Sequence, residues 1–367
     1  MKIRNWFGIL SALLCLTALA AETKPGQGES KRYKVLVMGD AHFDSAEFHK
    51  SPPATDGRKS ERERNFRMWK SKSPALFAAA GKRASAEHVE FAVQLGDLVQ
   101  GDSDDAKLQG AMIDKGFTTL KKNFPDIPLL IVKGNHDIRT LKKGRNNAAA
   151  NAALLPIISK ELNKKVTKNT CYSFMRGRDL FIAIDGFIPA KNTEAFVRRT
   201  LAAHPDTRYV FFMTHLPLMP ASTGSPLWLV PGWDTIADML EKRNTLILAA
   251  HTHSPSLATR TTDRGKLTQL IVSSMGNAWS GKRRHGGHGD WAGFSAAADK
   301  GILRAKDSEK AQAQWNAWKK SGDFTFRSLF GNSGFVVLDI DDEKVVARYY
   351  TSRSAKSGVT LELLKNR

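Results

Sequence analysis

Aspartate, asparagine and histidine residues recur in five short motifs of this sequence, and each motif directly follows an apolar run. The motifs are Gly39-Asp40-Ala41-His42, Gly96-Asp97, Gly134-Asn135-His136-Asp137, Thr214-His215 and His251-Thr252-His253. Their oxygens and imidazole nitrogens are metal ligands. Together they are enough for two metal ions roughly 3.5–4 Å apart, an arrangement used for in-line phosphoryl displacement. A metal-dependent phosphoesterase is therefore the leading functional hypothesis.

The elements that must position these side chains are strands of an α/β fold. Apolar runs predict strands at residues 33–38, 89–95, 128–132, 209–213 and 246–249, and each strand leads into one motif. Helical patterns alternate with them at residues 74–86, 106–122, 147–162, 193–203 and 235–243. In open α/β sheets, ligands gather at the carboxyl ends of the strands. The nearly continuous apolar strands also predict burial on both faces.

Other segments complete the predicted organisation. Residues 171–174 and 180–184 predict a strand pair around Gly177, and residues 333–340 and 344–351 predict a closing hairpin. Residues 45–72 are highly charged and predict an insertion or an irregular loop. Residues 276–330 break the α/β pattern and predict a cap or lid insertion.

The order of the motifs from Asp40 to His253 resembles the calcineurin-like metallophosphoesterase superfamily, in an exported bacterial-type member. The resemblance implies a metallophosphoesterase domain over residues 33–367. Its fold would be a four-layer α/β/β/α sandwich, with residues 276–330 as the C-terminal insertion or cap. Its activity would be hydrolysis of a phosphomonoester or phosphodiester by attack of a metal-bridging hydroxide.

The resemblance also implies two metal sites that share Asp97. The first would be held by Asp40, His42, Asp97 and His253, and the second by Asp97, Asn135, His215 and His251. The mixed nitrogen and oxygen set fits Mn, Fe or Zn and does not choose among them. His136 is not a ligand in the family pattern. As the catalytic residue it would stabilise the transferring phosphoryl group or protonate the leaving alkoxide.

Substrate would also be bound near these motifs, by Asn135, His136 and Arg139. Arg139 follows His136 by three residues and could bind a phosphate oxygen through the fork of its guanidinium group. The sequence departs from common family patterns at Gln100, where some phosphatase relatives carry an acidic residue that orients the catalytic histidine. Either Gln100 makes that hydrogen bond, or Asp102, Asp104 or Asp137 does. Ala250 replaces a glycine found in many relatives, which indicates that the backbone there needs no positive φ.

The formal net charge of +20 favours anionic partners, such as a phosphate-ester substrate or nucleic acid. One alternative function is therefore an extracellular or periplasmic nuclease, and a second is a non-catalytic binder of phosphate-bearing polymers. Lys282, Arg283 and Arg284 could contact an anionic substrate if residues 276–330 close over the metals. His285 and His288 could contribute to a third metal site, although two ligands make an incomplete one.

The N-terminus predicts export. Lys2 and Arg4 precede an apolar stretch, and Ala18-Leu19-Ala20 is a small-residue cleavage site. Residues 1–20 are therefore interpreted as a signal peptide cleaved near Ala20/Ala21, and residues 21–32 as a linker. A periplasmic or secreted protein with no transmembrane segment after cleavage is expected. Cleavage would also remove Cys15 and leave Cys171 alone, without an internal disulfide and most simply as a buried thiol.

Overall fold

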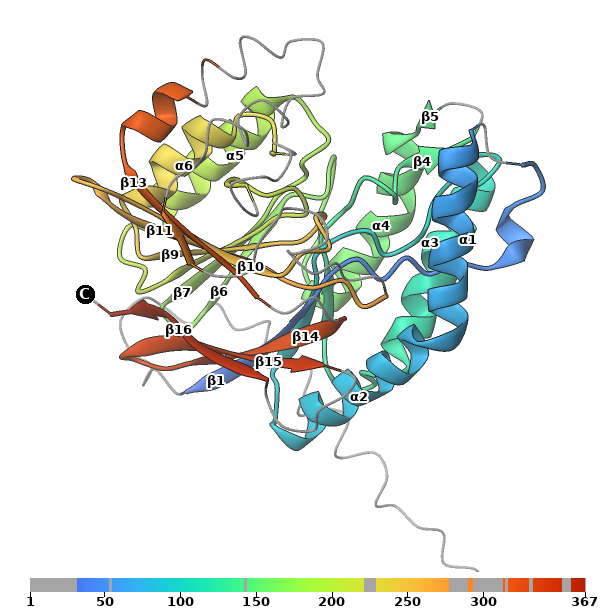
Figure 1. Ribbon diagram of the computed structural model, residues 1–367, viewed down its shortest axis with the longest axis horizontal. Coiled ribbons are helices and arrows are strands. Elements are labelled where there is room, and N and C mark those ends of the chain that lie inside the picture. The colour runs from blue at the N-terminus through green and yellow to red at the C-terminus, as the bar shows by residue number, and fades with distance from the viewer. Residues whose placement is uncertain are drawn as a thin grey trace, which may run out of the picture.

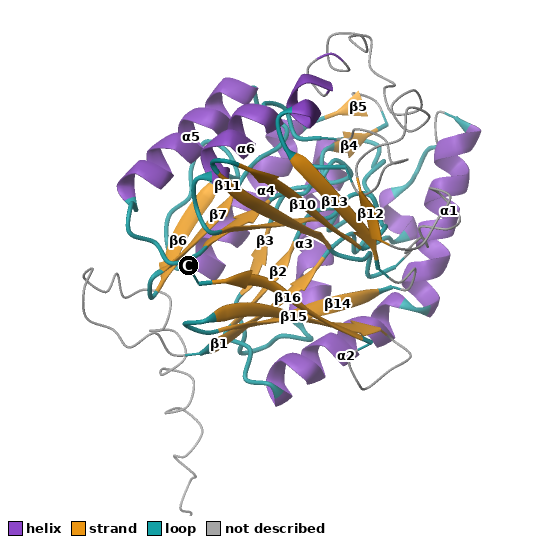
Figure 2. Cartoon of the chain, turned by 60° about the vertical axis from the view of Figure 1, so that its left-hand side comes forward, coloured by secondary structure: helices purple, strands orange, loops and turns teal. Residues whose placement is uncertain are grey.

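The structure is a computed structural model that describes residues 32–52, 55–141, 144–220, 229–276, 290–292, 313, 316–329, 333–351 and 358–366. The signal peptide and most of the linker predicted from the sequence lie outside these residues. Two sheets stack face to face, and helices cover both outer faces (Figures 1 and 2).

The first sheet has the strand order β16-β15-β14-β1-β2-β3. Its strands β1, β2 and β3 are parallel, and the others run antiparallel. Their bounds are β1 Tyr33–Met38, β2 Phe91–Gln94, β3 Leu129–Ile131, β14 Gly334–Ile340, β15 Lys344–Thr351 and β16 Val359–Lys365. The predicted closing hairpin is confirmed as β14–β15.

The second sheet has the strand order β12-β13-β10-β11-β9-β8-β7-β6, with β7, β8, β9 and β11 parallel. Its bounds are β6 Tyr172–Arg176, β7 Asp179–Ala183, β8 Val210–Met213, β9 Thr245–Ala249, β10 Ser256–Thr262, β11 Gly265–Ile271, β12 Asp290–Ala292 and β13 Asp323–Ser328. The predicted strand pair around Gly177 is the antiparallel pair β6–β7.

The helices are η1 Ala46–Phe48, α1 Asp56–Ser71, α2 Ser73–Ala86, α3 Ala106–Lys121, α4 Asn147–Leu162, α5 Ala190–Ala203 and α6 Trp233–Glu241. Figure 1 shows α5 and α6 over the outer face of the second sheet and α2 under the first. A further small sheet joins β4 Arg139–Thr140 to β5 Gly144–Arg145. The four-layer α/β/β/α arrangement is confirmed. No helix within the described ranges combines the length and the apolar character needed to cross a membrane.

Alternation along the strands explains the layering. In β8, Phe211 and Met213 enter the large core between the sheets, whereas Val210 and Phe212 enter a smaller core under α5 and α6. Because successive strand residues point to opposite faces, a strand covered on both faces must be apolar throughout. The predicted burial on both faces is confirmed.

The prediction of an irregular loop at residues 45–72 is wrong, because most of that segment is helix α1. The side chain of Thr55 caps the helix by accepting a hydrogen bond from the Arg58 N–H (3.3 Å). The helix buries few apolar side chains: Trp69 packs edge-on against Phe43, with ring centroids 4.9 Å apart, and much of the remaining attachment is polar, such as the bond from Asn65 to Gln100. Periodicity could not reveal a helix that buries so few apolar side chains.

Part of the predicted insertion at 276–330 belongs to the second sheet. Strand β13 pairs with β10, and β12 pairs with β13, so both extend the sheet at its edge. The remaining residues of this insertion lie mainly outside the described ranges, and the cap stays a prediction. Cys171 is buried, as expected, and forms no disulfide with any residue of the described ranges.

Candidate metal centre

The five motifs meet at the carboxyl ends of strands from both sheets. Asp40 and His42 follow β1, Asp97 follows β2, and Asn135 follows β3. From the second sheet, His215 follows β8, and His251 and His253 follow β9. A parallel bridge between Gly39 and Ser274 joins the segments that follow β1 and β11 at this edge. The strand topology therefore brings together residues up to 213 positions apart in the sequence.

The backbone of the candidate ligands is strained. Nine non-glycine residues in the described ranges have positive φ, and five of them are candidate ligands. Their φ values are 47° for Asp40, 47° for His42, 53° for Asp97, 67° for His251 and 55° for His253. Such conformations cost about 1–3 kcal/mol each and persist where the surrounding structure enforces them. Ala250 does not have positive φ, as expected for an alanine at a position where many relatives have glycine.

Two glycines allow the loops to approach each other. A Cβ at Gly134 would lie 2.0 Å from the Asp97 nitrogen and 2.2 Å from Asp97 Oδ1. Gly96 has φ +92°, and a Cβ there would lie 2.5 Å from His215 Nδ1. Any side chain at either position would displace a candidate ligand.

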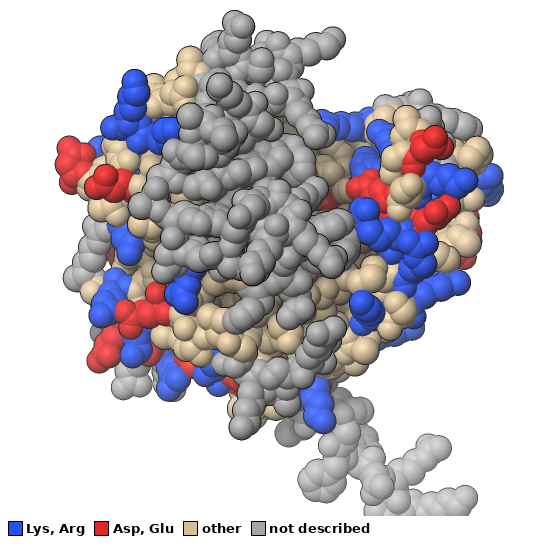
Figure 3. Space-filling model, in the orientation of Figure 1, with Lys and Arg blue, Asp and Glu red and all other residues tan. Residues whose placement is uncertain are grey.

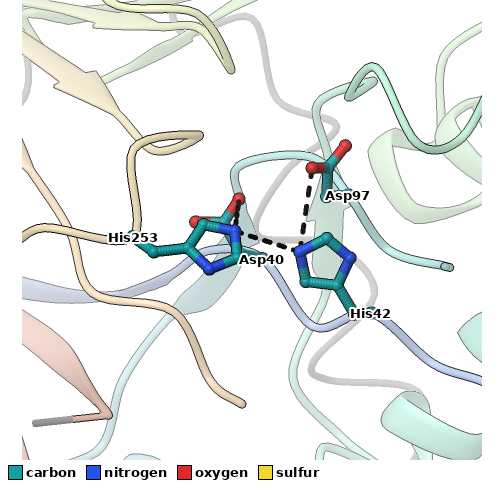
Figure 4. A group of neighbouring side chains, drawn as sticks. All are labelled: Asp40, His42, Asp97 and His253. Carbon is teal, nitrogen blue, oxygen red and sulfur yellow. Dashed lines mark hydrogen bonds and ion pairs between the residues drawn. The ribbon is translucent and has the colours of Figure 1, made fainter. Parts of the chain in front are cut away.

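The first ligand group consists of Asp40, His42, Asp97 and His253, whose ligand atoms lie within 4.8 Å of one another (Figure 4). The Nε2 atoms of His42 and His253 are 3.1 Å apart. His253 Nε2 is 3.5 Å from Asp40 Oδ1, and His42 Nε2 is 3.8 Å from Asp97 Oδ2. The four side chains converge on one point, as the sequence predicted.

The second ligand group consists of Asp97, His215 and His251. His215 Nδ1 lies 2.8 Å from the Leu95 carbonyl oxygen and donates to it, which directs Nε2 into the site. That Nε2 lies 2.9 Å from Asn135 Oδ1 and 3.2 Å from His251 Nδ1. Asn135 Oδ1, His215 Nε2 and His251 Nδ1 therefore lie close enough together to bind one cation, which would replace the proton that the protein alone places on His215.

Asp97 faces both groups. Its Oδ2 points toward His42, and its Oδ1 lies 3.3 Å from His215 Nε2. The His136 N–H also donates to Oδ1, at 2.7 Å, which fixes the carboxylate. The chemistry fits divalent cations for a second reason: Asp40 Oδ2 is fully buried and has no hydrogen-bond partner in the described part of the chain. An orphaned carboxylate oxygen in a desolvated site is costly unless a cation pairs with it.

The pKa directions show how strongly these groups depend on each other. Burial raises the pKa of Asp40 well above its usual value, and burial together with neighbouring His136 lowers the pKa of His42. Burial opposes ionisation of Asp97 as well, but His215 and His136 hold the pKa of Asp97 well below its usual range. Against the same burial, Asp97 raises the pKa of His215 to about 9. Without metal, the buried charges are therefore balanced by protons held on some of these side chains, such as His215. Bound cations would take the place of those protons.

His136 is oriented by a backbone oxygen. Its Nδ1 lies 2.7 Å from the Gln100 carbonyl oxygen, whereas the Gln100 side chain accepts from Asn65 Nδ2, also at 2.7 Å. Of the residues expected to make this bond, Gln100 makes it, through its backbone carbonyl oxygen and not through its side chain. Asp137 instead accepts from the N–H groups of Val99 and Gly134, and Asp102 pairs with Arg139. His136 belongs to neither ligand group.

Arg139 lies beside His136, as predicted, with its Nη1 atom 2.8 Å from His136 Nε2. Two carboxylates neutralise its charge: Asp102 at 2.5 Å and Glu61 at 2.9 Å. Glu61 comes from α1, so the sequence reasoning missed it together with the helix. A charged helix with no apolar stripe gives no signal that one of its residues faces a site.

The centre opens into a cavity of about 950 Å³. The candidate ligands Asp97, Asn135, His251 and His253 are among its lining residues. Its lining also includes the basic residues Arg64, Arg139 and Arg145 with Glu61, and the apolar residues Phe187, Ile188, Leu216, Leu229 and Pro231. The predicted contributions of Lys282, Arg283, Arg284, His285 and His288 lie outside the described residues.

Comparison with known proteins gives independent information. A family model described as calcineurin-like phosphoesterase matches residues 33–255. No curated protein sequence matches the chain. Among solved structures, PhoD aligns with a TM-score of 0.54 and 10% identity, over 94% of this chain and 71% of PhoD. A dimetal phosphatase from Danio rerio aligns with a TM-score of 0.49 and 11% identity, over 91% of this chain and 99% of that protein. At these identities the PhoD alignment shows a shared fold.

Proposed function

Because this chain belongs to the calcineurin-like phosphoesterase family and is a metal-dependent phosphoester hydrolase, we propose that it is an exported enzyme that hydrolyses a phosphomonoester or phosphodiester at a binuclear metal centre. The observation that carries the proposal is the position of Asp97. Its two carboxylate oxygens face two different groups of ligands.

The proposed ligands follow from the two groups. Asp40, His42, Asp97 and His253 hold one ion, and Asp97, Asn135, His215 and His251 hold the other, as Mn, Fe or Zn. When bound, the ions supply a water acidic enough to act as a nucleophile and neutralise the phosphoryl oxygens. The donor set and the orphaned oxygen of Asp40 support this proposal.

The surrounding residues bind and orient the substrate. Asn135, His136 and Arg139 line the cavity beside the ligands and face a phosphoryl group placed there. Arg139 Nη1 donates to His136 Nε2, because His136 Nδ1 already donates to Gln100. Arg139 is therefore the N–H donor at this edge, and we assign to the His136–Arg139 pair the positioning and hydrogen bonding of the transferring phosphoryl group.

The test compares turnover of bis(p-nitrophenyl) phosphate and p-nitrophenyl phosphate after loading with Mn, Fe or Zn. Turnover that disappears in Asp97→Ala supports the proposal, and the better substrate decides between diesterase and monoesterase. Absence of turnover with two ions bound contradicts a general phosphoesterase. A non-catalytic binder would keep its ligand affinity in both Asp97→Ala and His136→Ala.

Export is a separate part of the proposal. It is supported by the charged start, the apolar stretch and the small-residue site at Ala18-Leu19-Ala20. Mass spectrometry of the N-terminal peptide of protein recovered outside the cytoplasm should give Ala21 as the first residue. A chain recovered with residues 1–20 intact, or only inside the cell, contradicts it.

A further inference from the structure

A second cavity opens off the metal centre between α1 and the β4–β5 hairpin. Its volume is about 560 Å³, and its lining residues are Arg58, Glu61, Asn135, Arg139, Gly144 and Arg145. Glu61, Asn135, Arg139 and Arg145 also line the larger cavity. A molecule bound at the metal centre therefore lies next to this second cavity, which we call the side cavity.

Positive charge in the side cavity exceeds the negative charge available to balance it. Arg139 is neutralised by Asp102 and Glu61, and Arg58 lies 3.5 Å from the same Asp102. Arg145 is exposed and has no carboxylate partner within the described part of the chain. Three arginines therefore share two carboxylates, and the unbalanced charge is that of Arg145.

The fold places this charge where it is unfavourable without an anion. In the β4–β5 pair, Arg139 lies directly opposite Arg145 in the strand register. Like charges directly opposite each other on paired strands destabilise the pair. Glu61 and Asp102 offset the charge of Arg139, but an anion in the side cavity would offset that of Arg145. Figure 3 shows basic side chains gathered along the side of the molecule where α1 lies.

We propose that the side cavity binds a second phosphoryl group of the substrate, while the first lies at the metal centre. Guanidinium groups suit this role because they bind phosphate oxygens through paired hydrogen bonds. The natural substrate then carries at least two phosphoryl groups, and the apolar residues that line the larger cavity would contact the remainder of the molecule. This inference rests on the proposed function, because it places the first phosphoryl group at the metal centre.

Phosphonates separate binding from hydrolysis, because their carbon–phosphorus bond is not a phosphoester. The probes are alkane bisphosphonates with two to six carbons and the alkyl monophosphonates of the same lengths. Isothermal titration calorimetry on the metal-loaded protein gives a Kd for each pair. We expect the best bisphosphonate to bind roughly ten- to hundredfold tighter than its monophosphonate, as one additional charge-assisted interaction provides.

Three variants identify the site of the second group. Arg145→Gln should remove most of the bisphosphonate advantage, and Arg58→Ala should reduce it. Arg67→Ala, an exposed arginine of α1 that lines neither cavity, should retain it and is the charge-matched control. Equal affinities for both probes, or an advantage that survives Arg145→Gln, would overturn the inference.

The second phosphoryl group could come from a small molecule or from a nucleic-acid strand. A short single-stranded oligonucleotide that competes with the bisphosphonate and loses affinity in Arg145→Gln indicates the strand. Competition by nucleoside bisphosphates alone indicates the small molecule. The calorimetry and the turnover assay test the two proposals separately. If the protein hydrolyses no phosphate ester but still binds the bisphosphonate more tightly, the proposed function fails and the side-cavity inference stands.

Discussion

His136 lies close enough to act on the substrate but outside both ligand groups, and this separates its role from that of the metals. Its Nε2 atom is 3.9 Å from Asp97 Oδ2, and both residues line the cavity. Burial and the nearby Arg139 charge lower the pKa of His136, although Asp97 opposes the shift. A residue placed in this way should affect turnover more than metal affinity.

For His136→Ala we expect kcat to fall about 10²–10⁴-fold with metal content unchanged, the range that a positioned acid–base or charge-stabilising group contributes. Kinetics and metal analysis on the same preparation measure both effects. If His136 acts as a general acid, the loss will be larger for alkyl esters than for p-nitrophenyl esters. A loss of bound metal equal to the loss of turnover contradicts the assignment.

Gly134 tests whether the close approach of the loops matters. Gly134→Ala would push a Cβ into Asp97, so we expect weaker metal binding and a loss of stability of at least about 1–3 kcal/mol, the usual effect of overpacking. Urea denaturation and metal titration measure the two effects. Gly110→Ala in α3 meets no atom within 4 Å and should be neutral or slightly stabilising. Equal behaviour of the two variants would contradict the role of Gly134.

The strands explain which site residues could be predicted from the sequence. Each of Asp40, Asp97, Asn135, His215 and His251 comes immediately after an apolar strand, so the sequence alone placed them together. Side chains brought in by tertiary packing carry no such signal. Glu61 and Asn65 lie on a helix without an apolar stripe, and the Asp102–Arg139 ion pair joins two loops. The bond from His136 to the Gln100 carbonyl oxygen is a property of backbone geometry, which residue type does not report.

Residues 316–329, the end of the predicted insertion, are held against the second sheet by the buried side chain of Arg260. Arg260 of β10 is fully buried, pairs with Glu241 of α6 at 2.5 Å and lies over the Trp318 ring at 4.2 Å. It also donates to Ser321 Oγ, at 2.7 Å. Residues 316–329 therefore pack as part of the metallophosphoesterase domain.

Replacing Arg260 with Met leaves Glu241 buried without its main partner, which should cost about 3–5 kcal/mol. Arg264→Ala is the matched control, because Arg264 also reaches Glu241, at 3.1 Å, but is 40% exposed. Because Arg264 is largely in solvent and Glu241 keeps its bond to Arg260 in this variant, we expect a loss of at most about 1 kcal/mol. Chemical denaturation compares them, and similar losses of stability for both variants would show that the buried pair is not the anchor.

The candidate ligands of each proposed ion come from both sheets, so metal binding should stabilise the whole molecule. Asp40 and Asp97 come from the first sheet, whereas His215 and His251 come from the second. A ligand that binds only the folded state stabilises it by about 2.7 kcal/mol at a hundredfold excess over its Kd. The proposed ions would thus couple the sheets in addition to supplying chemistry.

Removing the metals with a chelator should lower Tm by roughly 5–10 °C, from about 2–4 °C per kcal/mol for a chain of this size class. Differential scanning calorimetry measures the shift. The same shift should occur in His136→Ala and be much smaller in Asp97→Ala, which has less metal to lose. A chelator-insensitive Tm in the wild type contradicts metal coupling between the sheets.

The binuclear centre bridged by Asp97 is tested most directly by metal stoichiometry during reconstitution. Metal-depleted protein would receive Mn stepwise, with bound Mn and phosphoester turnover measured at each step. We predict that turnover becomes maximal at two ions per chain and that Asp97→Ala binds fewer ions and loses turnover. Full turnover with one ion or none, or two bound ions and normal turnover in Asp97→Ala, would contradict the binuclear mechanism.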